Sequence, residues 1–390
     1  MNSLPARILA AVITFSLGVG LANLWLNSWS SDRIVCRLPV ATRPAARLEM
    51  VFVLDTTGSM GGLLDGAKQR IWGIVNGVMQ DSHSSVRVGL VAYRDRGDEY
   101  VTQVLPLTDD LDKVYTALMD YQAAGGGDGP EDVRTALAEA VHKINWSPAA
   151  PDLAQIMFLV GDAPPHEDYD EVDTLTTATI AAHKGIFVNT IQCGISGETT
   201  RAWQAIANRG HGQYFAIAAD GGVHVIATPY DEQLGDLARQ LGGTFVAYGF
   251  GTGAEGDAKR AEVMMSAVTA EERVATSAPA EAKAERAVNK AISPVAYFGD
   301  LFQQLENGSV KLEDLDPAQL PEALRSMSPS ERQQEIDRRL AQRRELRHQI
   351  TLLSKQRYDY IEAERKKNAG SDGFDVVVLK ALKEQMSRPF

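Results

Sequence analysis

The sequence predicts an α/β fold, a doubly wound and mostly parallel sheet with one antiparallel edge strand, followed by an α-helical C-terminal region. Between residues 48 and 249, apolar strand-like runs alternate with helical patterns, which is typical of a parallel sheet covered on both faces. The polar turn at residues 94–98 joins two strand-like runs and indicates a hairpin. Beyond residue 249 strand character is lost.

The elements of residues 48–249 can be placed in order. The first strand is expected at residues 48–54, an apolar run that ends in Asp55. Five more strands are expected at 86–93, 100–107, 155–160, 186–192 and 213–217. Helical patterns occupy 62–79, 111–121, 131–144, 172–183, 200–208 and 232–241, the last stopped by Gly242 and Gly243. Together they predict one domain.

The rest of the chain is predicted to be helical. Residues 250–292, rich in Ala, Glu, Lys and Gly, are interpreted as a linker with helical stretches, and residues 293–390 as a helical region. A capping box at Ser328–Glu331 opens a long helix over about 329–368. Its apolar stripe predicts a packed or paired helix, with self-association as a coiled coil open. The stripe comprises Ile336, Leu340, Leu346, Ile350, Leu353 and Ile361. Acidic residues interleave with Arg338, Arg339, Arg343, Arg344 and Arg347, which favours a solvated face.

The N-terminal residues 1–32 are expected to lie outside the fold. The uncharged apolar run 8–26 fits a signal peptide, with small residues at Gly20 and Ala22 for cleavage, and it is also long enough for a membrane anchor. Export is the favoured interpretation, to the periplasm or cell envelope, as a secreted or inner-membrane-anchored protein. The net charge of -12 argues against a nucleic-acid partner. Spacing does not decide whether Cys36 and Cys193 pair.

Three polar motifs follow predicted strands or precede helices. Asp55, Thr57 and Ser59 lie at alternate positions of a strand-to-helix turn, so that one carboxylate and two hydroxyls can converge. Oxygen ligands of this kind suit Mg²⁺ or Mn²⁺. Asp162 follows another strand, and a glycine-rich loop at 125–131 leads into a helix. Each motif alone also fits a capped turn or an ordinary loop, but three at one sheet edge favour a shared site.

These motifs resemble the metal-ion-dependent adhesion site of von Willebrand factor type A (VWA) domains. Asp55, Thr57 and Ser59 match the Asp-x-Ser/Thr-x-Ser signature, and Asp162 matches the distal aspartate. Asp128-Gly129-Pro130-Glu131 is similar to a loop of integrin beta subunits, which implies that Glu131 lies at the metal and Asp128 at an adjacent position. The resemblance implies a non-enzymatic adhesion or assembly protein that binds a carboxylate of a partner protein through the metal.

Two other functions remain open. A phosphatase of the haloacid dehalogenase type would use Asp55 as nucleophile and Asp162 as a Mg²⁺ ligand, but Thr57 stands where such an enzyme needs an acidic residue. A structural or assembly protein would instead act through its C-terminal helices. The sequence identifies no partner.

Overall fold

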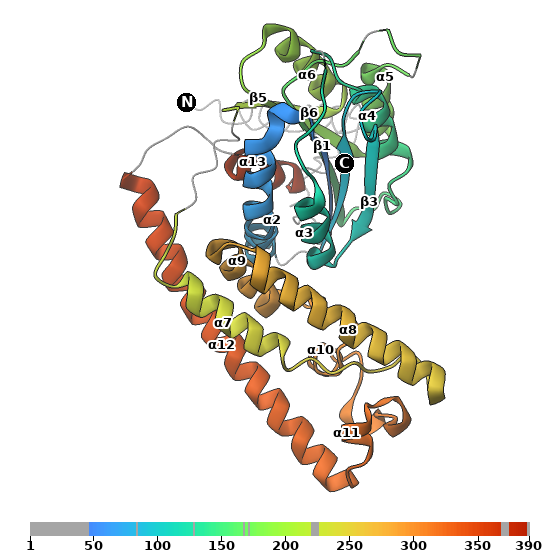
Figure 1. Ribbon diagram of the computed structural model, residues 1–390, viewed down its shortest axis with the longest axis vertical. Helices are drawn as coiled ribbons and strands as arrows, with labels where there is room; N and C mark the ends of the chain where they lie inside the picture. Colours follow the sequence, from blue (N-terminus) through green and yellow to red (C-terminus); the bar gives the residue numbers. More distant parts are fainter. Residues whose placement is uncertain are drawn as a thin grey trace, which may run out of the picture. The chain divides into compact units, whose positions relative to one another are not determined.

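The chain forms a six-stranded sheet with the order β3-β2-β1-β4-β5-β6 (Figure 1). The computed structural model describes residues 47–387 except 83–84, 128, 167, 171, 220–225 and 368–373. The strands are β1 (Arg47–Asp55), β2 (Ser85–Tyr93), β3 (Thr102–Thr108), β4 (Leu153–Gly161), β5 (Ile186–Cys193) and β6 (His211–Ile217). All neighbours pair in parallel except β2 and β3, which are antiparallel. The predicted fold class is confirmed.

Both faces of the sheet are buried under helices, because alternate side chains of the central strands are apolar on either side. On β1, Met50 and Phe52 enter one core, while Val51 and Val53 enter the core on the opposite face. The first core is covered by α2 (Gly61–Ser82), α3 (Leu111–Asp120) and α13 (Phe374–Met386). The second is covered by α4 (Val133–His142), α5 (Thr174–His183) and α6 (Gly197–Arg209).

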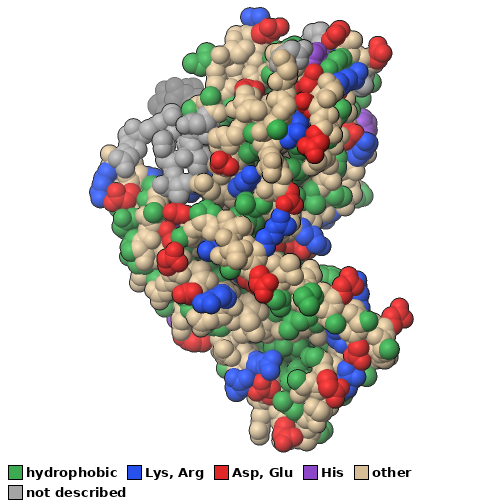
Figure 2. Space-filling model, in the orientation of Figure 1, with side chains coloured by type: hydrophobic (Ala, Val, Ile, Leu, Met, Phe, Trp, Pro, Cys, Tyr) green, Lys and Arg blue, Asp and Glu red, His purple; other side chains and the backbone are tan. Residues whose placement is uncertain are grey.

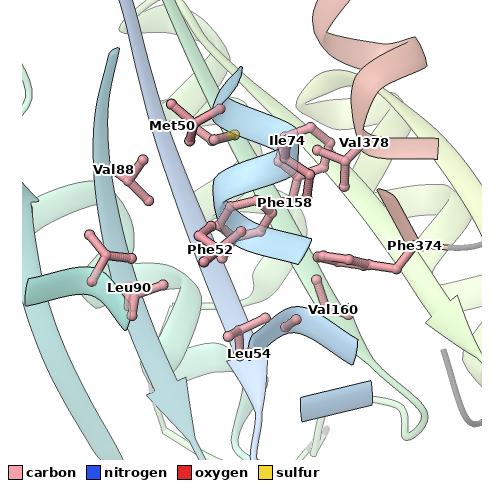
Figure 3. Close-up of a cluster of buried hydrophobic side chains, with 14 of the residues drawn as sticks. Met50, Phe52, Leu54, Ile74, Val88, Leu90, Phe158, Val160, Phe374 and Val378 are labelled. Atoms are coloured by element: carbon pink, nitrogen blue, oxygen red, sulfur yellow. The ribbon is translucent and has the colours of Figure 1, made fainter. Parts of the chain in front are cut away.

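The last helix of the chain, α13, completes the core of the sheet. Figure 3 shows Phe374 and Val378 of α13 among side chains of β1, β4 and α2. The ring of Phe374 lies 5.8 Å from that of Phe52, which stacks on Phe158 at 5.4 Å. Gly77 of α2 allows the close approach of α13, since a Cβ there would lie 3.0 Å from Leu379. The sheet therefore acquires one of its covering helices from the far end of the sequence.

Between β6 and α13 the chain forms a helical region. Its elements are α7 (Asp231–Gly242), α8 (Gly253–Ser277), α9 (Ala280–Ile292), α10 (Leu301–Glu306), α11 (Glu322–Arg325) and α12 (Pro329–Lys367), with 3₁₀ turns at Leu312–Asp314 and Pro317–Gln319. The expected linker 250–292 is thus largely α8 and α9. Helix α9 packs on α2, where Asn76 donates to the Glu285 carbonyl at 2.8 Å, and Arg286 forms an ion pair with Asp112 of α3. The described residues belong to one compact unit.

Helix α12 begins as predicted, since Ser328 and Glu331 form the reciprocal hydrogen bonds of a capping box. Its apolar stripe packs within the chain: Ile336 and Leu340 contact α10 and α11, and Ile350 contacts α7 and α9. The expectation of a solvated basic face is wrong for Arg343, which is fully buried and pairs with the buried Asp300 at 2.8 Å. Arg343 thus places a charged group on the packed side of α12, where Asp300 compensates its charge.

Several predictions fall on residues outside the described ranges. These are the N-terminal segment 1–32 with its apolar run, and Cys36. Cys193 is buried. Within the described residues, no helix has the length and apolar character needed to cross a membrane.

Candidate metal site

The turn after β1 gathers a carboxylate and two hydroxyls. Asp55, the last residue of β1, is fully buried, and its Oδ1 accepts the backbone N–H of Thr57 at 2.8 Å and the Thr57 hydroxyl at 2.6 Å. The Thr57 and Ser59 hydroxyl oxygens lie 3.4 Å apart. A short 3₁₀ turn, η1 (Gly58–Met60), carries Ser59 to the start of α2. The structure thus brings these three side chains together at the carboxyl end of the central strand.

The glycine-rich loop lies directly against this turn. Gly125 and Gly126 have φ values of +78° and +75°, a conformation that favours glycine. Gly58 donates its N–H to the Gly125 carbonyl at 3.2 Å. A Cβ on Gly126 would lie 3.1 Å from both Glu131 Oε1 and Thr57 Cβ. Gly126 therefore leaves the space in which the buried Glu131 approaches Thr57, and Gly125 leaves space for the Asp98 carboxyl.

The third segment follows β4. Glu131 donates its N–H to the Pro164 carbonyl at 3.0 Å, which fixes the loop beside Asp162. Asp162 is partly buried and faces the same cleft, and Thr199 of α6 donates its hydroxyl to the Asp162 carbonyl at 3.1 Å. Asp128, predicted to occupy an adjacent position, lies outside the described residues.

These segments enclose a cleft of about 470 Å³. Oxygen-bearing side chains from the β1, β4 and β5 ends of the sheet share its wall with the glycine-rich loop. The described residues that line it are Thr57, Gly58, Ser59, Gly125, Gly126, Gly129, Pro130, Glu131, Asp162, Ala163, Pro164, Ser196, Glu198 and Thr199.

Two buried carboxyl oxygens at the cleft lack hydrogen-bond partners among the described residues. Asp55 Oδ2 and Glu131 Oε2 are buried and accept no hydrogen bond from the described residues. Burial raises the pKa of Asp55 from 3.8 to about 7, and the nearby Asp162 adds to the rise. Burial, together with Asp55 and other acidic neighbours, raises the pKa of Glu131 from 4.5 to about 9. A bound cation would supply the missing positive charge, and both oxygens would be available to coordinate it.

The donor set fits a hard cation that keeps part of its water shell. Among the described residues, no three His, Cys, Asp or Glu side chains are placed to hold a metal ion. The candidate set combines the neutral hydroxyls of Thr57 and Ser59 with carboxyls that do not form such a cluster by themselves, and the cleft leaves room for water. Mg²⁺ is commonly bound in this way, by one or two carboxylates and several waters.

The interactions of Asp98 and His166 beside the site could not be predicted from the sequence. Asp98, in the β2–β3 hairpin, accepts the N–H of Gly126 at 3.1 Å and so ties the hairpin to the glycine-rich loop. His166 is buried; its Nε2 lies 3.2 Å from Asp95 Oδ1 and its ring stacks on Tyr169. The polar turn at residues 94–98 was the available signal, but its residues indicated only a hairpin.

Comparison with known proteins identifies the domain. Residues 49–229 match the family model of the von Willebrand factor A domain. The chain is 30% identical over 249 residues to von Willebrand factor A domain-containing protein 7 of Homo sapiens, covering 63% of this chain and 25% of that protein. The Mus musculus protein of the same name is 32% identical over 244 residues, covering 62% and 24%. The chain thus spans about a quarter of the length of these relatives.

Two solved structures are also similar. BatB from Bacteroides thetaiotaomicron matches with 18% identity and a TM-score of 0.34, covering 44% of this chain and 90% of that one. The SpRpn10 VWA domain matches with 15% identity and a TM-score of 0.35, covering 47% and 100%. VWA domains commonly mediate protein–protein interactions, are generally not enzymes and often bind a divalent metal. The family match, together with the six-stranded sheet and its helices, identifies residues 49–229 of this chain as a von Willebrand factor A domain.

Proposed function

We propose that the cleft binds Mg²⁺ or Mn²⁺ and that the protein uses this ion to bind a carboxylate of a partner protein. The observation that supports this most directly is the pair of buried oxygens, Asp55 Oδ2 and Glu131 Oε2, that lack hydrogen-bond partners beside two hydroxyls. The described residues that would hold the ion are Asp55, Thr57, Ser59, Glu131 and Asp162. Asp128, outside the described residues, is the sixth candidate.

The chain's own residues orient the site. Asp55 accepts both donors of Thr57, the backbone N–H and the hydroxyl proton, so the free lone pairs of that hydroxyl remain available to a cation. Thr199 positions Asp162 through its backbone carbonyl. A cation held by these residues would supply Lewis-acid chemistry toward a ligand carboxylate. Because no proton transfer or covalent step is required, the proposal is binding and not turnover.

Thermal unfolding of the full chain in EDTA, in Mg²⁺ and in Mn²⁺ tests the metal site. We expect a metal-dependent rise in the midpoint, because an ion that binds only the folded state stabilises it. Thr57→Val, which keeps the side-chain shape and removes the hydroxyl, should reduce the rise, and Asp55→Asn should abolish it. Asp65→Asn is the matched control, an exposed carboxylate on α2 away from the cleft lining. No rise with either metal would overturn the site.

Binding of a partner protein through the metal needs a separate measurement. Once a protein partner is in hand, isothermal titration in Mg²⁺ and in EDTA should give an affinity that depends on the metal. An affinity that is unchanged in EDTA would rule out metal-mediated recognition while leaving the fold assignment intact.

A phosphatase would require an acid near the nucleophile. In the structure the Thr57 hydroxyl donates to Asp55, and a threonine hydroxyl is too weak an acid for that role near neutral pH. Hydrolysis of a chromogenic phosphate ester should therefore stay at background. Turnover by the wild type that is lost in Asp55→Asn would replace the binding proposal with an enzymatic one.

We also propose export to the periplasm or cell envelope, supported by the apolar run at residues 8–26. Fractionation of cells, with mass spectrometry of the mature N-terminus, distinguishes a cleaved signal peptide from a retained anchor. Recovery of the intact, unprocessed chain in the cytosolic fraction would contradict export.

A further inference from the structure

We propose that α8 is a dimerisation helix, whose exposed apolar face pairs with the same face of a second copy of this chain. The two paired helices run antiparallel. This inference goes beyond the proposed function, because no residue of α8 belongs to the described lining of the metal cleft. A dimer of this kind holds two copies of the cleft, so a partner with two binding sites gains affinity by avidity.

Helix α8 is buried along one side only. It packs on α7 and on the 3₁₀ turn at Pro317–Gln319, and Val263 and Val274 contact the cores beneath it. The solvent side carries large apolar side chains, Met264, Met265 and Val268, with exposed fractions of 42%, 66% and 43%. Figure 1 shows α8 on the other side of the helical region from α12, and Figure 2 shows hydrophobic side chains among charged ones at the surface of this region. The described residues leave this side of α8 exposed.

The spacing of the exposed positions indicates that the partner is a helix. Exposed residues, nearly all of them apolar, recur along α8 at alternating intervals of four and three residues. This alternation is the heptad repeat of a coiled-coil seam, in which each side chain enters a gap on a facing helix. The residues of this seam are Ala254, Ala258, Ala261, Met265, Val268, Glu272 and Ala275.

The seam matches itself when one copy is reversed end to end. Its large residues, Met265 and Val268, lie at the middle of the 25-residue helix, and alanines occupy both ends. A reversed copy therefore sets Met265 beside Val268 of the partner copy on both sides of a twofold axis. The same alignment sets Ala258 beside Ala275. Such self-complementarity is what an isologous dimer requires.

The residues that flank the seam favour the antiparallel direction. Glu255 and Glu262 lie beside the seam in the N-terminal half of α8, and the equivalent positions in the C-terminal half are Thr269 and Thr276. Reversal of one copy places each glutamate beside a threonine. A parallel pair would instead place Asp257 beside Glu262 of the other copy, and like charges in such positions oppose association.

Basic neighbours within α8 reduce this difference without removing it. Lys259 lies 2.8 Å from Glu262, and Arg260 lies 2.6 Å from Asp257. The apolar middle of the seam therefore supplies most of the affinity, and the charges select the direction.

Two other arrangements fit the described residues less well. Helix α12, whose stripe predicts a paired helix, packs that stripe within its own chain, whereas the seam of α8 is exposed. A lipid surface with anionic headgroups would meet the carboxylates of Glu255 and Glu262 beside the seam.

Sedimentation velocity of the full chain in EDTA tests the dimer without a contribution from a bound metal. A mild non-ionic detergent accommodates the apolar run at residues 8–26. The seam is only about 37 Å long, so we expect a weak dimer that forms between about 1 and 100 μM. Met265→Lys should raise the dimer dissociation constant at least about tenfold, because two like charges would meet near the twofold axis. Leu352→Lys is the matched control, since it changes a half-exposed apolar residue of α12, and it should leave the constant unchanged.

Paired cysteines test the direction of the helices. Every variant carries Cys36→Ser, and the buried Cys193 is retained. Ala258→Cys combined with Ala275→Cys should give a covalent dimer with a short bis-maleimide. Ala258→Cys alone should not, because its two copies lie about 25 Å apart in the antiparallel pair. The same separation within one helix prevents a link inside the chain.

The possible results separate the alternatives. A wild-type chain that stays monomeric at about 100 μM would overturn the inference. A dimer that Met265→Lys leaves intact would also overturn it, and weakening by Leu352→Lys alone would move the interface to α12. A covalent dimer of the Ala258→Cys chain alone would indicate a parallel pair and overturn the antiparallel arrangement. Each of these outcomes leaves the proposed metal site standing, because the measurements are made in EDTA.

Discussion

The raised pKa values at the cleft make stability depend on pH and on metal in a linked way. For Asp55 the folded value of about 7 exceeds the ordinary value of 3.8, so the folded chain keeps a proton that the unfolded chain releases. Without metal, the free energy of unfolding must therefore fall as the pH rises through this interval. The full effect for Asp55 is about 4 kcal/mol, of which about 3 kcal/mol is lost between pH 5 and pH 8. Glu131, with a pKa of about 9, extends the fall to higher pH.

Urea unfolding at pH 5, 6.5 and 8, in EDTA and in saturating Mg²⁺, measures this effect. In EDTA the free energy of unfolding should decrease with pH, and the gap between Mg²⁺ and EDTA should widen because the ion needs the ionised carboxylates. Asp55→Asn should remove most of both trends. Carboxyls with lowered pKa values, such as Asp112 held by Arg286, titrate below this window and do not mask the trend. A wild-type chain whose stability in EDTA is as flat as that of Asp55→Asn would refute the reasoning.

Two further predictions concern the core and the backbone of the site. Phe374→Ala should lower the free energy of unfolding by about 3–5 kcal/mol, because it empties a buried ring position, whereas Val376→Ala on the exposed side of the same helix should change it by less than about 1 kcal/mol. Equal effects in urea titrations would show that α13 does not dock on the sheet. Gly161→Ala should reduce the Mg²⁺-dependent rise in the midpoint of thermal unfolding, because its Cβ would lie 2.5 Å from the Tyr93 hydroxyl beside the site. Gly129→Ala should retain this rise, because a Cβ at residue 129 would meet open space.

The sheet was predictable because its signals are local. Each strand of the sheet is a short apolar run bounded by turn residues, and the hairpin follows from the polar turn at 94–98. The role of α13 was not predictable in this way. Nothing in residues 374–386 specifies contact with β1, because that contact joins positions more than 300 residues apart and depends on the path of the intervening helices. The burial of Arg343 could not be predicted for the same reason, because its partner Asp300 lies outside α12.

The candidate metal site also combines features that the sequence predicts with features that depend on contacts between distant segments. The alternation of Asp55, Thr57 and Ser59 on one turn, and the position of Asp162 after a strand, follow from sequence and topology. The burial of these side chains does not follow from sequence and topology, because it depends on how the loops pack on one another. The approach of the glycine-rich loop to Thr57, the burial of His166 and the contribution of α6 to the rim all arise from such loop-to-loop contacts. Ligand identity at these residues stays a prediction.

The cost of burying the carboxyls of the site relates the site to the core. A penalty of about 4 kcal/mol at one carboxyl is a large fraction of the 5–15 kcal/mol by which typical domains are stable. The buried side chains of α13 offset it, because Phe374, Val378 and Leu382 each contribute about 1.5–3 kcal/mol by burial against the sheet. A chain cut after residue 249 would keep the strained site and lose this offset. Removing α13 should therefore make the folded population depend more strongly on Mg²⁺.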